Sequence, residues 1–227
     1  MTIDDAAIVR LSLWVALWAT VATLPLAVAV AALLSRTQFW GKSVVNGVVH
    51  LPLVLPPVVT GYLLLRLFGR HGAIGGVLEQ WFGIVFAFRW TGAALAAGVM
   101  GFPLMVSAIR VALDGVDHRL EESARTLGAN RLWAFLTVSL PLVVPGVASG
   151  MVLAFAKALG EFGATITFVS NIPGETQTLA LSIYTLTQTP GGDEHALRLV
   201  LLSVALSFAA LIASELLARR ARRADRR

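Results

Sequence analysis

Long stretches without a charged residue divide the chain. They are Leu11–Leu34, Val44–Leu65, Trp90–Ile109, Leu132–Ala156 and Leu199–Ala218, the last interrupted by Glu215. Each holds 20 to 25 residues, and about 20 apolar residues in a helix cross the hydrocarbon core of a bilayer. The pattern predicts an all-α, polytopic membrane protein with five transmembrane helices, at about residues 9–35, 44–68, 90–110, 138–160 and 197–218. No linker divides the chain, so we expect one membrane domain over residues 1–227.

Composition agrees with this pattern. Hydrophobic residues make up 57% of the chain and charged residues 14%, whereas about a quarter of a soluble domain is charged. There is no cysteine, which excludes disulfides and thiolate metal sites. Asp4 and Asp5 stand where a secretory signal would carry positive charge, so we expect the first apolar stretch to be a retained helix.

The basic residues predict the orientation, because cytoplasmic loops carry an excess of Lys and Arg. With the N-terminus outside and the C-terminus in the cytoplasm, twelve of the 18 Lys and Arg residues lie inside, six of them in the tail "RRARRADRR". Residues 111–137 then form a cytoplasmic loop and residues 162–195 an outer loop. The pI near 10.7 is thereby explained by topology, and we expect no nucleic-acid partner.

The threonine-rich segment 162–189 is the ambiguous part of this topology. If it crossed the membrane, the 111–137 loop and the basic tail would lie on opposite sides, against the charge rule. We therefore place it outside. A partly re-entrant path stays open, with its irregular backbone covered by protein or facing water.

Two apolar segments share a proline pattern. "LPLVLPPVVTG" at 51–61 and "LPLVVPGVASG" at 140–150 agree at seven of eleven positions. Proline inside a helix removes a hydrogen bond and bends the helix. Pro56, Pro57 and Pro145 are thus expected to break or kink their helices, which could be bent helices lining a pore. The alternative is that prolines are simply more frequent in membrane helices.

A short charged segment interrupts the apolar chain before the fourth span. Asp117 can cap a helix, Gly128 can end it in left-handed geometry, and Asn130 can cap the next helix. Leu120, Ala124 and Leu127 share one face, and Glu122 and Arg125 point the other way. At about 15 Å the helix is too short to span. It suits docking in another protein's groove, or lying on the membrane surface.

The motif that follows carries a family resemblance. Glu122-Ser123-Ala124, three residues, Gly128, nine residues, then Val138-Ser139-Leu140-Pro141 is similar to the EAA loop of ABC-importer permeases. Ser123 and Val138 depart from the family's Ala and Ile, both conservatively. The resemblance implies type I importer architecture, with this loop as the cytoplasmic coupling helix that docks on an ATPase. The coupling residues it implies are Glu121, Glu122, Ser123, Ala124, Gly128, Leu140 and Pro141.

Two further segments narrow the resemblance. "HLPLVLPPVVTGYLLL" at 50–65 and "ALGEFGATITFVSNIPGETQTLALSIYTL" at 158–186 resemble the permease subunit of molybdate importers. The resemblance implies a bacterial inner-membrane subunit that imports molybdate, and also tungstate. It further implies a homodimer surrounded by membrane lipid, with a cytoplasmic ABC ATPase dimer and a periplasmic molybdate-binding protein. Sulfate and thiosulfate permeases share the Gly-Glu-Phe-Gly pattern, so another oxyanion of this class is the alternative.

Lys157 and Glu161 lie one helical turn apart near the outer end of the fourth span. They could be a charge-compensated pair at the interface. Alternatively, Lys157 supplies a positive field for an entering dianion, and Glu161 holds the Lys157 side chain in place. With Pro56, Pro57 and Asn171, they are the candidate residues of the pore or its entrance. The outer segment that holds Asn171, Pro173 and Glu175 is expected to meet the loaded binding protein.

Other functions find little support in the sequence. "WGKS" at 40–43 lacks the glycine that a phosphate-binding loop needs at position 36, which is Arg36. His50, His71, His118 and His195 show no ligand spacing. We therefore expect no catalytic, cofactor or metal site, and ATP hydrolysis by a partner subunit. A secondary transporter would show larger inverted repeats and charged residues at the midplane.

Overall fold

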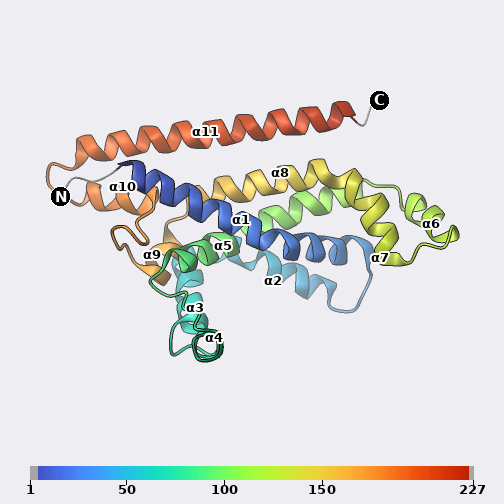
Figure 1. The fold of residues 1–227 in the computed structure, drawn as a ribbon, viewed down its shortest axis with the longest axis horizontal. Helices are drawn as coiled ribbons and strands as arrows, with labels where there is room; N and C mark the ends of the chain where they lie inside the picture. Colours follow the sequence, from blue (N-terminus) through green and yellow to red (C-terminus); the bar gives the residue numbers. More distant parts are fainter. Residues whose placement is uncertain (1–4, 225–227) are drawn as a thin grey trace.

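The computed structural model describes residues 5–224, which form helices joined by short connections (Figure 1). Within this range, four helical segments are long and apolar enough to cross a membrane, and a bent helix pair can supply a fifth. The four are α1 (Asp5–Arg36), α5 (Trp90–Asp114), the run Arg131–Leu159 that ends in α8 (Leu140–Leu159), and α11 (Asp193–Ala224).

The bent pair is α2 (Lys42–Val54) and α3 (Pro57–Phe68), whose axes differ by 113°. Leu55 and Pro56 between them have extended backbone, with ψ of 145° and 132°, as expected before a proline. Figure 1 shows α3 turning away from the long helices and carrying α4 (Gly75–Phe82) at its far end. The break predicted at Pro56 and Pro57 is therefore present.

The other proline segment behaves differently. Pro145 lies inside α8, which continues through it to Leu159, so the helix does not break there. Close packing explains the difference, because Gly146 and Gly150 bring α8 directly against α5. The irregularity falls earlier, in the π-helix η1 (Phe135–Ser139), just before Pro141. A wide turn accommodates the ring and missing N–H of a proline at this point.

Helices α1, α5 and α8 form the centre of the molecule. In α5, 67% of the residues in its most apolar stretch are buried, against 11% in α11. Small residues allow close approach: a Cβ on Gly101 would lie 3.1 Å from the Ala154 carbonyl oxygen of α8. Such contacts are typical of packed membrane helices. In contrast, α11 contacts α8 and α10 (Leu179–Thr187) and leaves a broad apolar surface exposed.

The long helices run between two ends of the molecule. One end, here the α6 end, holds α6 (His118–Thr126), α7 (Arg131–Ala134) and the last turns of α1, α5 and α11 (Figure 1). The opposite α9 end holds α9 (Gly163–Val169), α10 and the first turns of α1 and α11. The segment expected as an outer loop at 162–195 thus contains two short helices. Ser12 of α1 accepts a 2.8 Å hydrogen bond from the Leu179 backbone N–H, which fixes α1 to α10.

Candidate functional site

Local capping shapes the charged segment at the α6 end. The Asp117 side chain accepts a hydrogen bond from the Arg119 N–H, and Asn130 accepts one from the Trp133 N–H, at 2.9 and 2.8 Å. Gly128 has φ of 97°, the left-handed conformation that favours glycine after a helix. All three predicted signals are confirmed. They hold α6 as a separate helix between α5 and the start of the fourth long helical run.

An ion pair connects α6 to α1. Arg36 Nε at the end of α1 lies 3.2 Å from Glu121 Oε1 of α6, and their side chains are only 11% and 20% exposed. Ser139, fully buried in η1, donates a hydrogen bond to the same Glu121 oxygen and lies 3.5 Å from Arg36 Nη2. We call Arg36, Glu121 and Ser139 the clamp. It joins α1, α6 and the π-helix at one point, so a displacement of α6 would be passed to both long helices.

The two faces of α6 have different surroundings. Glu121, Glu122 and Arg125 line a cavity of about 710 Å³ between α6, the end of α1 and α7–η1. Leu120 and Leu127 point elsewhere and are 46% and 90% exposed. Exposed leucines on a short helix at the end of a membrane bundle form an apolar contact surface. This exposure fits both interpretations of the segment, docking on a partner and lying on the membrane surface.

The remaining residues of the motif have structural positions. The Ser123 hydroxyl donates to the Arg119 carbonyl within α6, and Ala124 is half-buried. Leu140 and Pro141 begin α8 directly after the π-helix. The motif therefore covers one continuous path from the exposed helix to the core of the bundle.

At the α9 end, Lys157 and Glu161 form a second polar centre. Glu161 Oε2 accepts a 2.6 Å hydrogen bond from Lys157 Nζ, and Oε1 accepts a 3.0 Å bond from the Ala164 N–H. The Glu161 side chain is 1% exposed and that of Lys157 31%. Both oxygens of the buried carboxylate are thus occupied, and Lys157 keeps part of its surface accessible. Glu161 fixes the start of α9 relative to the end of α8.

Pro57 lies close to this centre. A Cβ on Gly163 would stand 2.7 Å from Pro57 Cβ, and one on Gly61 would stand 2.5 Å from the Ala164 carbonyl oxygen. Helix α3 therefore packs tightly on α9, immediately after the break at Leu55–Pro56. The structure brings Pro56, Pro57, Lys157 and Glu161 into one region around the α2–α3 bend.

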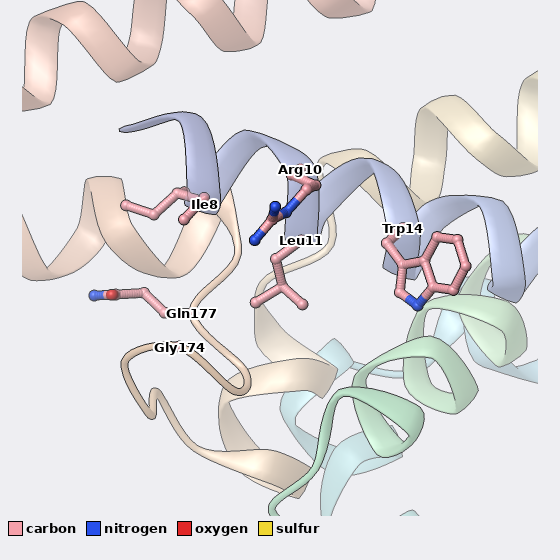
Figure 2. Close-up of a pocket in the computed structure, with 7 residues that line it drawn as sticks. Ile8, Arg10, Leu11, Trp14, Gly174 and Gln177 are labelled. Carbon is pink, nitrogen blue, oxygen red and sulfur yellow. The ribbon is translucent and has the colours of Figure 1, made fainter. Parts of the chain in front are cut away.

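Asn171 lies in the connection between α9 and α10. Its side-chain amide donates a 2.5 Å hydrogen bond to Thr185 Oγ1 of α10. Glu175 in the same connection lies with Oε1 3.4 Å from the Trp90 N–H at the start of α5. A pocket of about 410 Å³ separates this connection from the first turns of α1. Figure 2 shows Arg10 and Leu11 extending from α1 toward the turn that holds Gly174, while Ile8 and Gln177 extend to the left.

Sequence reasoning missed two members of the clamp and one polar network. Arg36 and Ser139 are 103 positions apart, and they meet each other and Glu121 only in the folded chain. The network joins α2 to α5: His50 lies 2.9 Å from Ser107 Oγ, and Arg110 donates to Asn46 Oδ1 at 3.0 Å. Its signal in the sequence was faint, consisting of single polar residues within apolar stretches.

Comparison with known proteins identifies the class to which this helical membrane fold belongs. A family model described as "Binding-protein-dependent transport system inner membrane component" matches residues 23–223, and the chain belongs to this family. It is therefore an inner-membrane transport subunit. The structure is similar to a bacterial ABC transporter that imports alginate, with TM-score 0.74, 17% identity, and coverage of 96% of this chain and 80% of that one. An amino acid ABC transporter gives TM-score 0.63 at 19% identity, covering 97% and 100%.

Relatives of known name are much more similar in sequence. The chain is 60% identical to the molybdenum transport system permease protein ModB of Escherichia coli K12 over 211 residues, covering 93% of this chain and 92% of the relative. It is 55% identical to ModB of Haemophilus influenzae, covering 93% of each. It is 38% identical to a putative molybdenum transport system permease protein of Bacillus subtilis, covering 88% of each.

Proposed function

We propose that this chain is the permease subunit of a binding-protein-dependent importer of molybdate, and also of tungstate. The observation that carries the substrate is the 60% identity to the Escherichia coli molybdenum permease across nearly the whole of both chains. Sulfate and thiosulfate importers share the general architecture, but the high-identity relatives bear molybdenum transport names. The family membership supplies the transport role, and the relatives supply the ion.

The proposed assembly is a permease homodimer with two cytoplasmic ATPase subunits and a periplasmic binding protein. The α6 end faces the cytoplasm in this proposal. Its support is the charge rule: Arg36, Lys42, Arg110, Arg119, Arg125 and Arg131 all belong to the α6 end. Leu120 of α6 and Leu127 directly after it are the proposed contact with the ATPase. The α9–α10 connection beside Arg10 is the proposed contact with the binding protein. ATP hydrolysis belongs to the ATPase partner, so this chain acts as a transport subunit and not as an enzyme.

The proposed mechanism transmits force through the clamp. A dianion cannot enter hydrocarbon, so a polar path must open on one side at a time. Closure of the ATPases would displace α6, and the Arg36–Glu121 ion pair would move the end of α1 with it. Ser139 would pass the same displacement into η1 and α8. We propose that the gate lies at the α9 end, where Lys157 would attract the entering anion. The break at Pro56 and the tight α3–α9 contact support this location.

Reconstitution tests this function. The complete transporter is assembled in proteoliposomes with its ATPase and binding protein, and uptake of molybdate, tungstate and sulfate is measured against ATP hydrolysis. We expect molybdate and tungstate to stimulate hydrolysis and to accumulate inside, and sulfate to do neither. Uptake of sulfate in the presence of a sulfate-binding protein, together with no uptake of molybdate, would assign the chain to the alternative oxyanion.

A further inference from the structure

The cavity between α6 and the long helices has two chemically different walls. One wall is apolar and belongs to α1 and to the start of the fourth long run; its members are Pro25, Val28, Ala29, Leu132, Phe135 and Leu136. The rim consists of charged residues from α1, α6 and α7. Several lining side chains are exposed, among them Leu33 at 43%, Leu132 at 67% and Leu136 at 42%. The cavity is therefore open to its surroundings.

The charges of the rim leave an excess of basic groups. Arg36 and Glu121 neutralise each other in the clamp. Arg125, Arg131 and Glu122 also line the cavity, and in the part of the chain that the structure describes none of the three has an oppositely charged group within ion-pair distance. The rim thus presents two arginines against one carboxylate. Guanidinium groups bind phosphate well, and both of these line the same cavity.

We propose that this cavity binds an anionic phospholipid of the inner leaflet. Arg125 and Arg131 would hold the phosphate, and an acyl chain would lie along the apolar wall formed by α1 and η1. The location agrees, because the cavity begins beside the membrane-spanning part of α1 at Pro25 and ends at the polar α6. Basic pockets between membrane helices on the cytoplasmic side are where anionic headgroups bind. A soluble anion would make no favourable contact with the apolar wall, whereas an acyl chain would.

The bound lipid would wedge α6 against α1 beside the clamp, so it would influence how rigidly α6 follows the ATPase. The inference rests on the proposed orientation of the chain but not on which oxyanion is carried. Molybdate-stimulated hydrolysis, measured on the same samples, reports separately on the proposed function.

The experiment is native mass spectrometry of the complete transporter, titrated with phosphatidylglycerol or phosphatidylcholine. The test variant is Arg125→Gln/Arg131→Gln, and the matched control is Arg89→Gln/Arg119→Gln, two exposed arginines that do not line the cavity. We expect phosphatidylglycerol to bind about tenfold to thirtyfold more weakly to the test variant and unchanged to the control, since each arginine near the anionic headgroup contributes about a factor of five.

A second variant separates a lipid from a free phosphate. Ala29→Trp fills the apolar wall and leaves both arginines in place; Ala29 is exposed, so the indole can be accommodated. Loss of phosphatidylglycerol binding in this variant supports a lipid site. Undiminished lipid binding in both variants, or equal binding of phosphatidylcholine to the unaltered transporter, would overturn the proposal. The proposal would also be overturned if the unaltered transporter bound no phosphatidylglycerol but both it and Ala29→Trp bound inorganic phosphate.

Discussion

Gly61 of α3 and Ala164 of α9 lie so close that a methyl group on Gly61 would stand 2.5 Å from the Ala164 carbonyl oxygen and 2.9 Å from its Cα. The neighbouring atoms belong to the backbone and cannot simply rotate away. This contact holds α3 against α9 directly after the bend of the second predicted span. Two features therefore stabilise the bend: the prolines interrupt the helix, and Gly61 allows α3 to pack closely on α9.

Gly61→Ala tests this contact. We expect a loss of about 1–3 kcal/mol in the free energy of unfolding, because overpacking forces the two helices apart. The matched control is Gly47→Ala in α2, where a Cβ would meet nothing within 4 Å and alanine improves helix propensity. Thermal unfolding of the purified transporter in detergent measures both. Equal melting temperatures for the two variants would refute the close packing of α3 on α9.

The clamp predicts a specific defect in coupling. Glu121→Gln removes the charge facing Arg36 and should lower the free energy of unfolding by about 1–3 kcal/mol. Binding-protein-stimulated ATP hydrolysis should fall together with uptake, and the exchange Arg36→Glu/Glu121→Arg should restore part of both. Glu194→Gln is the control, since it breaks an exposed pair with Arg198 that contributes little. If Glu121→Gln transported the normal amount of molybdate per ATP hydrolysed, the clamp would play no part in coupling.

Gly128 tests the exit from α6. Its φ of 97° is costly for a β-branched residue, while asparagine visits this region more readily. Gly128→Val should therefore lose co-purification with the ATPase, and Gly128→Asn should retain most of it. Since a Cβ at Gly128 would meet nothing within 4 Å, a simple clash cannot account for a difference between the variants. Membrane insertion of both serves as the expression control. Co-purification of Gly128→Val at the normal level would contradict the docking role.

Lys157 and Glu161 require a paired experiment. Lys157→Met alone leaves a buried carboxylate without its cation, which costs about 3–5 kcal/mol. Lys157→Met/Glu161→Gln removes the charge of both partners and should be much more stable. We expect slow molybdate uptake in both variants if Lys157 attracts the anion. Normal uptake by the double variant, with instability of the single one, would make the pair purely structural.

Much of the α6 end could be predicted because its signals are local. Asp117, Gly128 and Asn130 act on backbone within a few residues, so their roles follow from chemistry that one short segment contains. The break at Pro56 is equally local. Pro145 shows where such reasoning ends, because packing of α5 against α8 decides whether its helix continues.

The clamp could not be predicted, since it depends on three segments that approach one another only in the folded chain. Arg36 resembled any basic residue that follows a membrane span, and Ser139 resembled a polar residue tolerated in an apolar one. Likewise, periodicity gave no means to distinguish a loop at 162–195 from the two short helices found there. Contacts such as Ser12 with Leu179, 167 positions apart, determine that arrangement.

The π-helix Phe135–Ser139 contains about one residue more per turn than an α-helix and lies between α7 and α8. One additional residue in a helical turn rotates everything before it by roughly 100° relative to an uninterrupted α-helix. The direction in which α7 and α6 present themselves to a partner is therefore set by a residue count. Deleting a single amino acid between Phe135 and Ser139 would rotate α6 and α7 about the helix axis. The contact surface would keep the same residues but would face in a different direction.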